Sequence, residues 1–75
     1  KGHIRLLVAN INVPNMVGQV TTILAQNEIN IASLLNSHKG KIAYNIIDVD
    51  GNVTCEVLEK IKAIDGIIMV RIIRS

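Results

Sequence analysis

The stretch Asn10-Ile11-Asn12-Val13-Pro14-Asn15-Met16-Val17-Gly18 joins two kinds of periodicity and decides how the chain begins to fold. Before it, apolar side chains alternate over residues 3–9, as in a β-strand. From Met16 to Gln26 the apolar residues instead recur at helical spacing. Pro14 ends the extended run, because its ring fixes φ. The stretch therefore predicts a strand-to-helix junction, where the first N–H groups of a helix lack partners and favour an anionic group.

The rest of the chain alternates between extended and helical patterns in the same way. We expect strands at residues 29–36, 42–49 and 67–73, a hairpin connection at 37–41, and a second helix ended by Asp65-Gly66. Thr54 is the expected N-cap of that helix, with Val53 and Leu58 placed as a hydrophobic staple. The order β-α-β-β-α-β predicts an α+β, ferredoxin-like fold: a four-stranded antiparallel sheet with two helices on one face.

The composition suits one small domain with an aliphatic core. Of the 75 residues 49% are hydrophobic, and isoleucine alone occurs fourteen times. We interpret residues 1–75 as a single domain and as a fragment of a longer chain. Both faces of the predicted sheet are apolar: the first strand offers Leu7 and Ala9 opposite Ile4, Leu6 and Val8, and the last offers Ile68, Val70 and Ile72 opposite Ile67, Met69 and Ile73. We therefore expect a homodimer that covers a sheet face or edge.

Several classes of function are disfavoured by the composition. The net charge of +2 forms no cluster, and Tyr44 is the one aromatic residue, which argues against nucleic-acid binding. No apolar run reaches the roughly 20 residues that span a membrane. The single Cys55 suits a reducing, cytoplasmic setting, and the isolated His3 and His38 have no neighbours at metal-ligand spacing. We expect no metal, no cofactor and no catalytic residue in this chain.

Asn30 is the polar residue that the strand pattern explains least. It lies between Ile29 and Ile31, where asparagine is disfavoured, so its amide needs a local turn or a ligand as partner. We expect Asn30 near the same end of the fold as Asn10 and Asn12. Three amides and the N–H groups of a helix start could together hold the ammonium and carboxylate groups of a free amino acid.

The quoted junction also resembles a known family. Asn12-Val13-Pro14-Asn15-Met16-Val17, followed after a helix by Glu28-Ile29-Asn30-Ile31-Ala32, resembles the ACT domain, a regulatory module that binds small molecules. More narrowly, residues 30–32, 43–50 and 64–71 are similar to the ACT domains that end the D-3-phosphoglycerate dehydrogenases. The resemblance implies a parent enzyme that oxidises 3-phosphoglycerate with NAD held outside this chain.

The resemblance also implies how an effector is bound. Two domains pair into a continuous eight-stranded sheet, and L-serine lies at their interface. The implied binding residues are Asn10, Asn12, Val13, Pro14, Asn15, Met16 and Val17 of one copy, with Asn30 and Ile31 of the other.

This chain departs from the family pattern at two of these positions. Members commonly have Pro-Gly where this chain has Pro14-Asn15, and asparagine tolerates positive φ, so we expect the turn to persist. Asn10 stands where serine-binding members can carry histidine, and its amide can still form hydrogen bonds. Two alternatives stay open: a structural dimerisation module without a ligand, and an ACT domain of another host, such as iron–sulfur L-serine dehydratase or a branched-chain biosynthetic enzyme.

Overall fold

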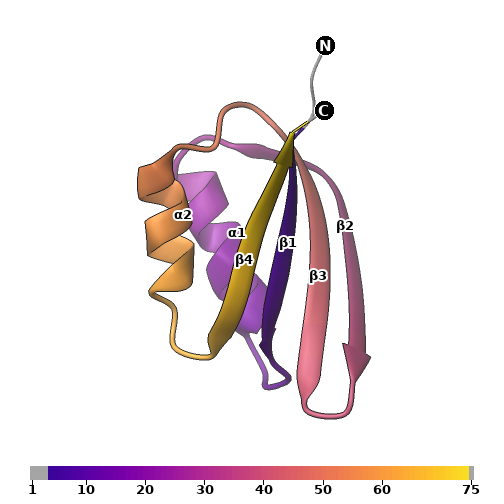
Figure 1. Cartoon of the computed structure of the whole chain (residues 1–75). Coiled ribbons are helices and arrows are strands. Elements are labelled where there is room, and N and C mark those ends of the chain that lie inside the picture. Colours follow the sequence, from indigo (N-terminus) through magenta and orange to yellow (C-terminus); the bar gives the residue numbers. More distant parts are fainter. Residues whose placement is uncertain (1–3, 75) are drawn as a thin grey trace.

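Four strands and two helices alternate along the chain in the computed structural model, which describes residues 4–74 (Figure 1). The elements are β1 (Ile4–Ile11), α1 (Met16–Gln26), β2 (Asn30–Lys39), β3 (Ile42–Asp50), α2 (Cys55–Lys62) and β4 (Ile67–Arg74). The predicted order and the ferredoxin-like fold are confirmed. His3, where the first predicted strand begins, lies outside the described residues.

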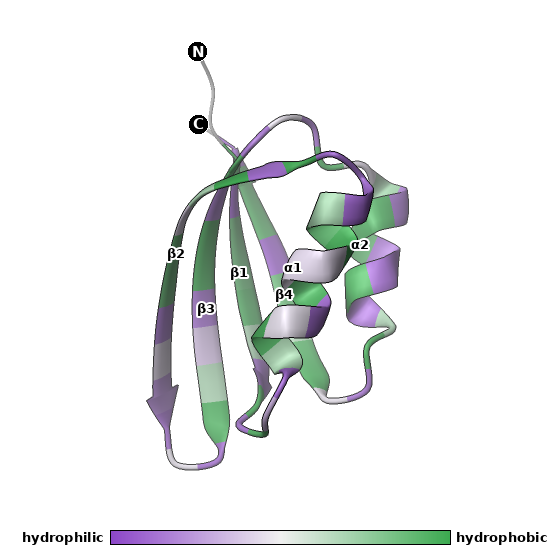
Figure 2. Cartoon of the chain, turned by 180° about the vertical axis from the view of Figure 1, so that it is seen from behind, coloured by the Kyte–Doolittle hydropathy of each residue, from purple (hydrophilic) through white to green (hydrophobic). Residues whose placement is uncertain are grey.

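The sheet has the strand order β2-β3-β1-β4, and every neighbouring pair is antiparallel. The two central strands are therefore β3 and β1, and β2 and β4 form the edges. Both helices lie on the same side of the sheet (Figures 1 and 2). The core between these layers consists of Leu6, Val8, Val20, Leu24, Ile29, Ile47, Val49, Val53, Val57 and Ile61. Thr54 is the N-cap of α2, as predicted, and its hydroxyl accepts a hydrogen bond from the N–H of Val57.

Two local expectations about the strands were wrong. The hairpin connection expected at residues 37–41 is only a tight turn at Gly40-Lys41, because a glycine at φ 63° lets β2 and β3 pair up to Lys39 and Ile42. The pairing of β1 with β4 shifts between Ala9 and Asn10. This irregularity turns Ile67 towards the core, although simple alternation had assigned it to the opposite face.

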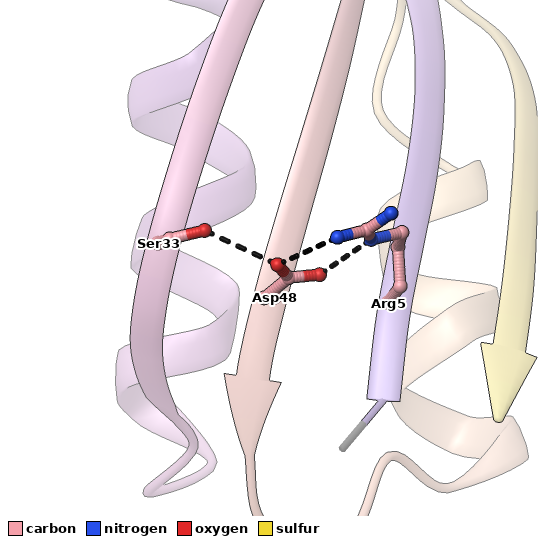
Figure 3. Close-up of polar contacts among 3 residues, drawn as sticks. All are labelled: Arg5, Ser33 and Asp48. Atoms are coloured by element: carbon pink, nitrogen blue, oxygen red, sulfur yellow. Dashed lines mark hydrogen bonds and ion pairs between the residues drawn. The ribbon is translucent and has the colours of Figure 1, made fainter. Parts of the chain in front are cut away.

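The sheet face away from the helices combines apolar side chains with one polar row. Leu35 and Tyr44 remain 65% and 49% exposed. Arg5 donates to the carboxylate of Asp48 through Nε at 2.7 Å and Nη2 at 3.0 Å, and the Ser33 hydroxyl donates to the same carboxylate at 3.2 Å (Figure 3). The hydrogen bond and the charge of Asp48 raise the pKa of Arg5 above its usual value. The Arg5–Asp48 pair is balanced in charge, and the face also exposes Arg71, which pairs with Leu7 of β1, beside the apolar residues.

Candidate functional site

The loop between β1 and α1 lies at the end of the sheet that also holds the β2–β3 turn and the connection from α2 to β4 (Figure 1). Both of these neighbours hold it by main-chain hydrogen bonds. The N–H of Asn12 donates to the carbonyl of Lys41 at 2.7 Å, and the N–H of Ile11 donates to the carbonyl of Gly66 at 2.9 Å. A Cβ on Gly66 would lie 3.0 Å from Ile11 Cγ1 and 3.1 Å from Met16 Cε. The loop is therefore seated between two turns, and the close approach requires glycine at position 66.

The start of α1 leaves its N–H groups without a side-chain cap. Asn15 is the N-cap residue and has φ 69° and ψ 12°, which confirms the expected left-handed turn. Among the described residues, the Asn15 side chain makes no capping hydrogen bond, and the first turn of α1 contains no acidic residue. A Cβ on Gly18 would lie 2.5 Å from Asn15 Oδ1, so any residue other than glycine there must move the Asn15 side chain. The helix start keeps the partial positive charge that attracts an anion.

The predicted site residues on this loop differ in accessibility. Asn12, Val13, Pro14 and Asn15 are exposed, Val17 is half-buried, and Met16 is buried in the interior. The Asn12 amide makes one long hydrogen bond, donating to the carbonyl of Gly40 at 3.4 Å. A ligand at this loop would therefore contact the Asn12 amide and the main chain, and the buried Met16 side chain would lie beneath the loop.

Asn10 lies below the loop surface. Its side chain is 2% exposed, and its Nδ2 donates to the carbonyl of Ile11 at 2.7 Å. Its Oδ1 accepts from Nδ2 of Asn45 at 2.8 Å. The sequence interpretation missed Asn45, which is also 2% exposed and accepts from Nδ2 of Asn36. A signal was present, because Asn45 falls on the same alternating face of its strand as Ile47 and Val49 and so had to be buried.

Asn30 lies at the other end of the sheet from the β1–α1 loop, which corrects the expectation that all three asparagines share one end. It is the first residue of β2 and pairs with Asp50, the last residue of β3. The reason is the direction of the chain: β1 runs to the loop, and α1 returns to the far end before β2 begins (Figure 2). Asn30 is exposed, so its amide can be satisfied by solvent. Within one copy, the structure does not bring Asn30 to Asn12.

Two surface grooves are lined in part by residues of α1. One, of about 290 Å³, lies at the helix start and is lined by Asn15, Gly18, Gln19, Thr22, Ile23 and Ile64. The other, of about 570 Å³, lies towards the helix end and is lined by Thr21, Thr22, Ala25, Glu28, Ile29, Asn30 and Ile31. Each groove thus holds one part of the predicted site. A site that included both parts would need the first groove of one copy near the second groove of another.

The described residues contain neither a helix long and apolar enough to cross a membrane nor a group of three histidine, cysteine, aspartate or glutamate side chains placed for a metal ion. Cys55 is exposed at the start of α2.

Comparisons with known proteins bear first on the sequence and then on the fold. No family model matches the sequence. The chain is 33% identical over 73 residues to D-3-phosphoglycerate dehydrogenase of Haemophilus influenzae, and the match covers 97% of this chain but only 18% of that enzyme.

Solved structures extend this comparison to the fold. The crystal structure of the ACT domain of GTP pyrophosphokinase from Chlorobium tepidum matches with a TM-score of 0.78 at 15% identity, covering 95% of this chain and 96% of that one. The regulatory subunit of aspartate kinase from Thermus thermophilus matches with a TM-score of 0.68 at 20% identity, covering 92% of this chain and 50% of that one. At these identities the likeness shows a shared fold.

Proposed function

We propose that this chain, which has the fold of the ACT regulatory domains, binds a free amino acid where two copies of the chain meet. The observation that carries the proposal is the uncapped start of α1 beside the exposed amide of Asn12. Unpaired N–H groups and the helix dipole favour a carboxylate, and the asparagine amide can bind a second polar group of the same ligand. We propose Asn10 together with residues 12–17 as one half of the site.

The edge strand β2 supplies a way to bring in the other half. It has ten residues, and apart from the half-buried Leu34 all of them are exposed. If two copies pair antiparallel through β2 about its middle, Asn30 of one copy lies level with Lys39 of the other. Lys39 belongs to the same hairpin as Lys41, whose carbonyl holds the loop at Asn12. Asn30 and Ile31 of the second copy would then complete the site.

The finer assignment is L-serine as effector and a D-3-phosphoglycerate dehydrogenase as parent protein. It is supported by the 33% identity to the Haemophilus influenzae enzyme over nearly the whole of this chain. In that assignment NAD and the oxidation of 3-phosphoglycerate belong to parts of the parent beyond this chain. Serine would regulate the parent if it binds one arrangement of the pair more tightly than another, because only such a difference shifts a conformational equilibrium.

Calorimetric titration with L-serine, glycine and L-aspartate, combined with sedimentation, tests this function. We expect saturable heat with L-serine and a dimer whose formation is favoured by the ligand. Asn30→Ala should abolish the heat while leaving the fold intact, since Asn30 is exposed. Asn52→Ala is the matched control, because Asn52 is an exposed asparagine in the turn before α2. Absence of heat and of chemical-shift change with every amino acid at millimolar concentration would refute the sensing role.

A structural dimerisation module is the second candidate function. It is favoured by the exposed apolar residues of the helix-free sheet face, such as Leu35 and Tyr44. Stable dimers whose parent enzyme responds to no amino acid would select this alternative. An ACT domain of another host remains the third, and the activity of the purified parent protein would distinguish it from a dehydrogenase.

A further inference from the structure

Three asparagines form a hydrogen-bonded row across β2, β3 and β1. Nδ2 of Asn36 donates to Oδ1 of Asn45 at 2.5 Å, and Nδ2 of Asn45 donates to Oδ1 of Asn10 at 2.8 Å. Nδ2 of Asn10 then donates to the main-chain carbonyl of Ile11 at 2.7 Å. Asn10 and Asn45 are each 2% exposed, so the inner part of the row is shielded from water. Among the described residues, every buried side-chain nitrogen or oxygen has a hydrogen-bond partner.

The direction of the row is fixed by its last member. A carbonyl oxygen can only accept, so Asn10 must turn Nδ2 towards Ile11 and Oδ1 towards Asn45. Asn45 must therefore donate with Nδ2 and accept with Oδ1, which in turn requires Nδ2 of Asn36 to point inward. Reversing one amide would leave a buried donor facing a donor or an acceptor facing an acceptor. Asn45 thus holds the Asn10 amide in one of its two orientations.

The carbonyl at the end of the row belongs to the loop that leads into α1. The oxygen of Ile11 also accepts from the N–H of Val13 at 3.0 Å, which closes a tight turn. The N–H of Ile11 is meanwhile held by the carbonyl of Gly66. The row consequently secures the peptide at which the chain leaves β1 and sets the path by which it reaches Asn15 and the helix start.

We propose that Asn45 is a positioning residue of the amino-acid site. It touches no ligand itself: through Asn10 it fixes the Ile11 carbonyl and so orients the Val13 turn and the N–H groups that follow. The proposal rests on the proposed function for its ligand readout, but the order of the loop can be measured without any ligand. In this proposal Asn10 connects Asn45 to the Ile11 carbonyl beneath the loop, as its burial also suggests.

The experiment compares amide hydrogen exchange at Val13 in the wild-type chain and in Asn45→Leu, which keeps the branched shape of the asparagine side chain but cannot form either hydrogen bond. We expect the protection of the Val13 N–H to fall by about tenfold relative to that of Val49 in the core. Affinity for L-serine should fall by a similar factor, because the binding groups are less well held. Asn27→Ala is the matched control, since it removes a 2.8 Å amide hydrogen bond to the Ile23 carbonyl at the far end of α1.

Asn45→Asp keeps the proposal testable if the leucine variant does not fold. A protonated aspartic acid can donate to Asn10 and accept from Asn36, whereas the ionised form can only accept. Protection of Val13, corrected for the intrinsic rate, should therefore be near wild type at low pH and be lost as pH rises. The wild-type chain, measured at the same pH values, is the control for any effect of pH that does not depend on residue 45.

Each outcome decides a separate claim. Unchanged Val13 protection in Asn45→Leu, or a loss no greater than in Asn27→Ala, would overturn the positioning role even if serine binds. Val13 protection that does not change with pH in Asn45→Asp would overturn the positioning role as well. If the wild-type chain binds no amino acid while Val13 still loosens selectively in Asn45→Leu, the proposed function fails and the control of the loop by the row stands.

Discussion

The starts of the two helices differ in how their unpaired N–H groups are satisfied. The start of α2 is satisfied from within the chain: Thr54 accepts from the N–H of Val57 at 3.3 Å, and Glu56 places a negative charge in the first turn. The start of α1 has neither device in the described structure, and its N-cap residue, Asn15, is held in the left-handed region. Local sequence could supply a cap at either place. The difference supports the proposal that an anion from outside binds at the start of α1, whereas the start of α2 is stabilised by its own side chains.

The largest effect should come from removing the support beneath the α1 start. Gly66→Ala should lower the free energy of unfolding by about 3 kcal/mol, because it combines an unfavourable φ of 102° with close contacts to Ile11 and Met16. Gly51→Ala is the matched control: φ there is 117°, but nothing lies within 4 Å of the added Cβ. Urea denaturation should show the smaller loss for Gly51→Ala. Equal losses would mean that the contact with the loop contributes little.

Placing a negative charge in the first turn of α1, as α2 already has, should lower the affinity for the effector. Val17 holds the place in α1 that Glu56 holds in α2, two residues after the N-cap. Val17→Glu should weaken binding of an amino-acid carboxylate by about tenfold, because the glutamate carboxylate then interacts with the positive end of the helix dipole and repels the carboxylate of the ligand. The reciprocal Glu56→Val should leave the affinity unchanged in calorimetry. If both variants lost affinity alike, the distinction between the two helix starts would be wrong.

Removing the cap of α2 should affect stability alone. Thr54→Ala should cost about 1 kcal/mol of unfolding free energy, since the N–H of Val57 loses its acceptor. Thermal denaturation measures this loss, and serine affinity in the folded variant should match the wild type. Thr54→Ser restores the hydroxyl and should recover most of the stability. A variant that keeps full stability without the hydroxyl would show that α2 does not depend on its cap.

The smallest effect should come from Asn15→Gly. Glycine relieves the left-handed conformation at φ 69° but also gains freedom in the unfolded chain, so stability should rise by no more than about 0.5 kcal/mol. Chemical denaturation can detect a change of this size across replicate measurements. A loss of more than about 1 kcal/mol would instead reveal a stabilising role for the Asn15 side chain.

The sequence was most informative where local rules determine structure. The cap at Thr54 and the left-handed Asn15 were both predicted, because each depends on a few neighbouring residues. The predicted position of Asn30 was wrong because the three asparagines were grouped by residue type and the direction of the chain was overlooked. The chain returns through α1, so β2 starts at the far end of the sheet. Asn45 was missed because its partners, Asn10 and Asn36, depend on the register between strands.

The central claim, that the start of α1 and not that of α2 receives a carboxylate, is tested most directly by a nuclear magnetic resonance titration of the amide N–H groups. L-serine should shift the N–H signals of residues 16–18 at the start of α1 and leave those of residues 55–57 at the start of α2 in place. Serinamide, which lacks the carboxylate, should produce neither shift. Equal shifts at the two helix starts, or shifts at α1 that serinamide reproduces, would contradict the account.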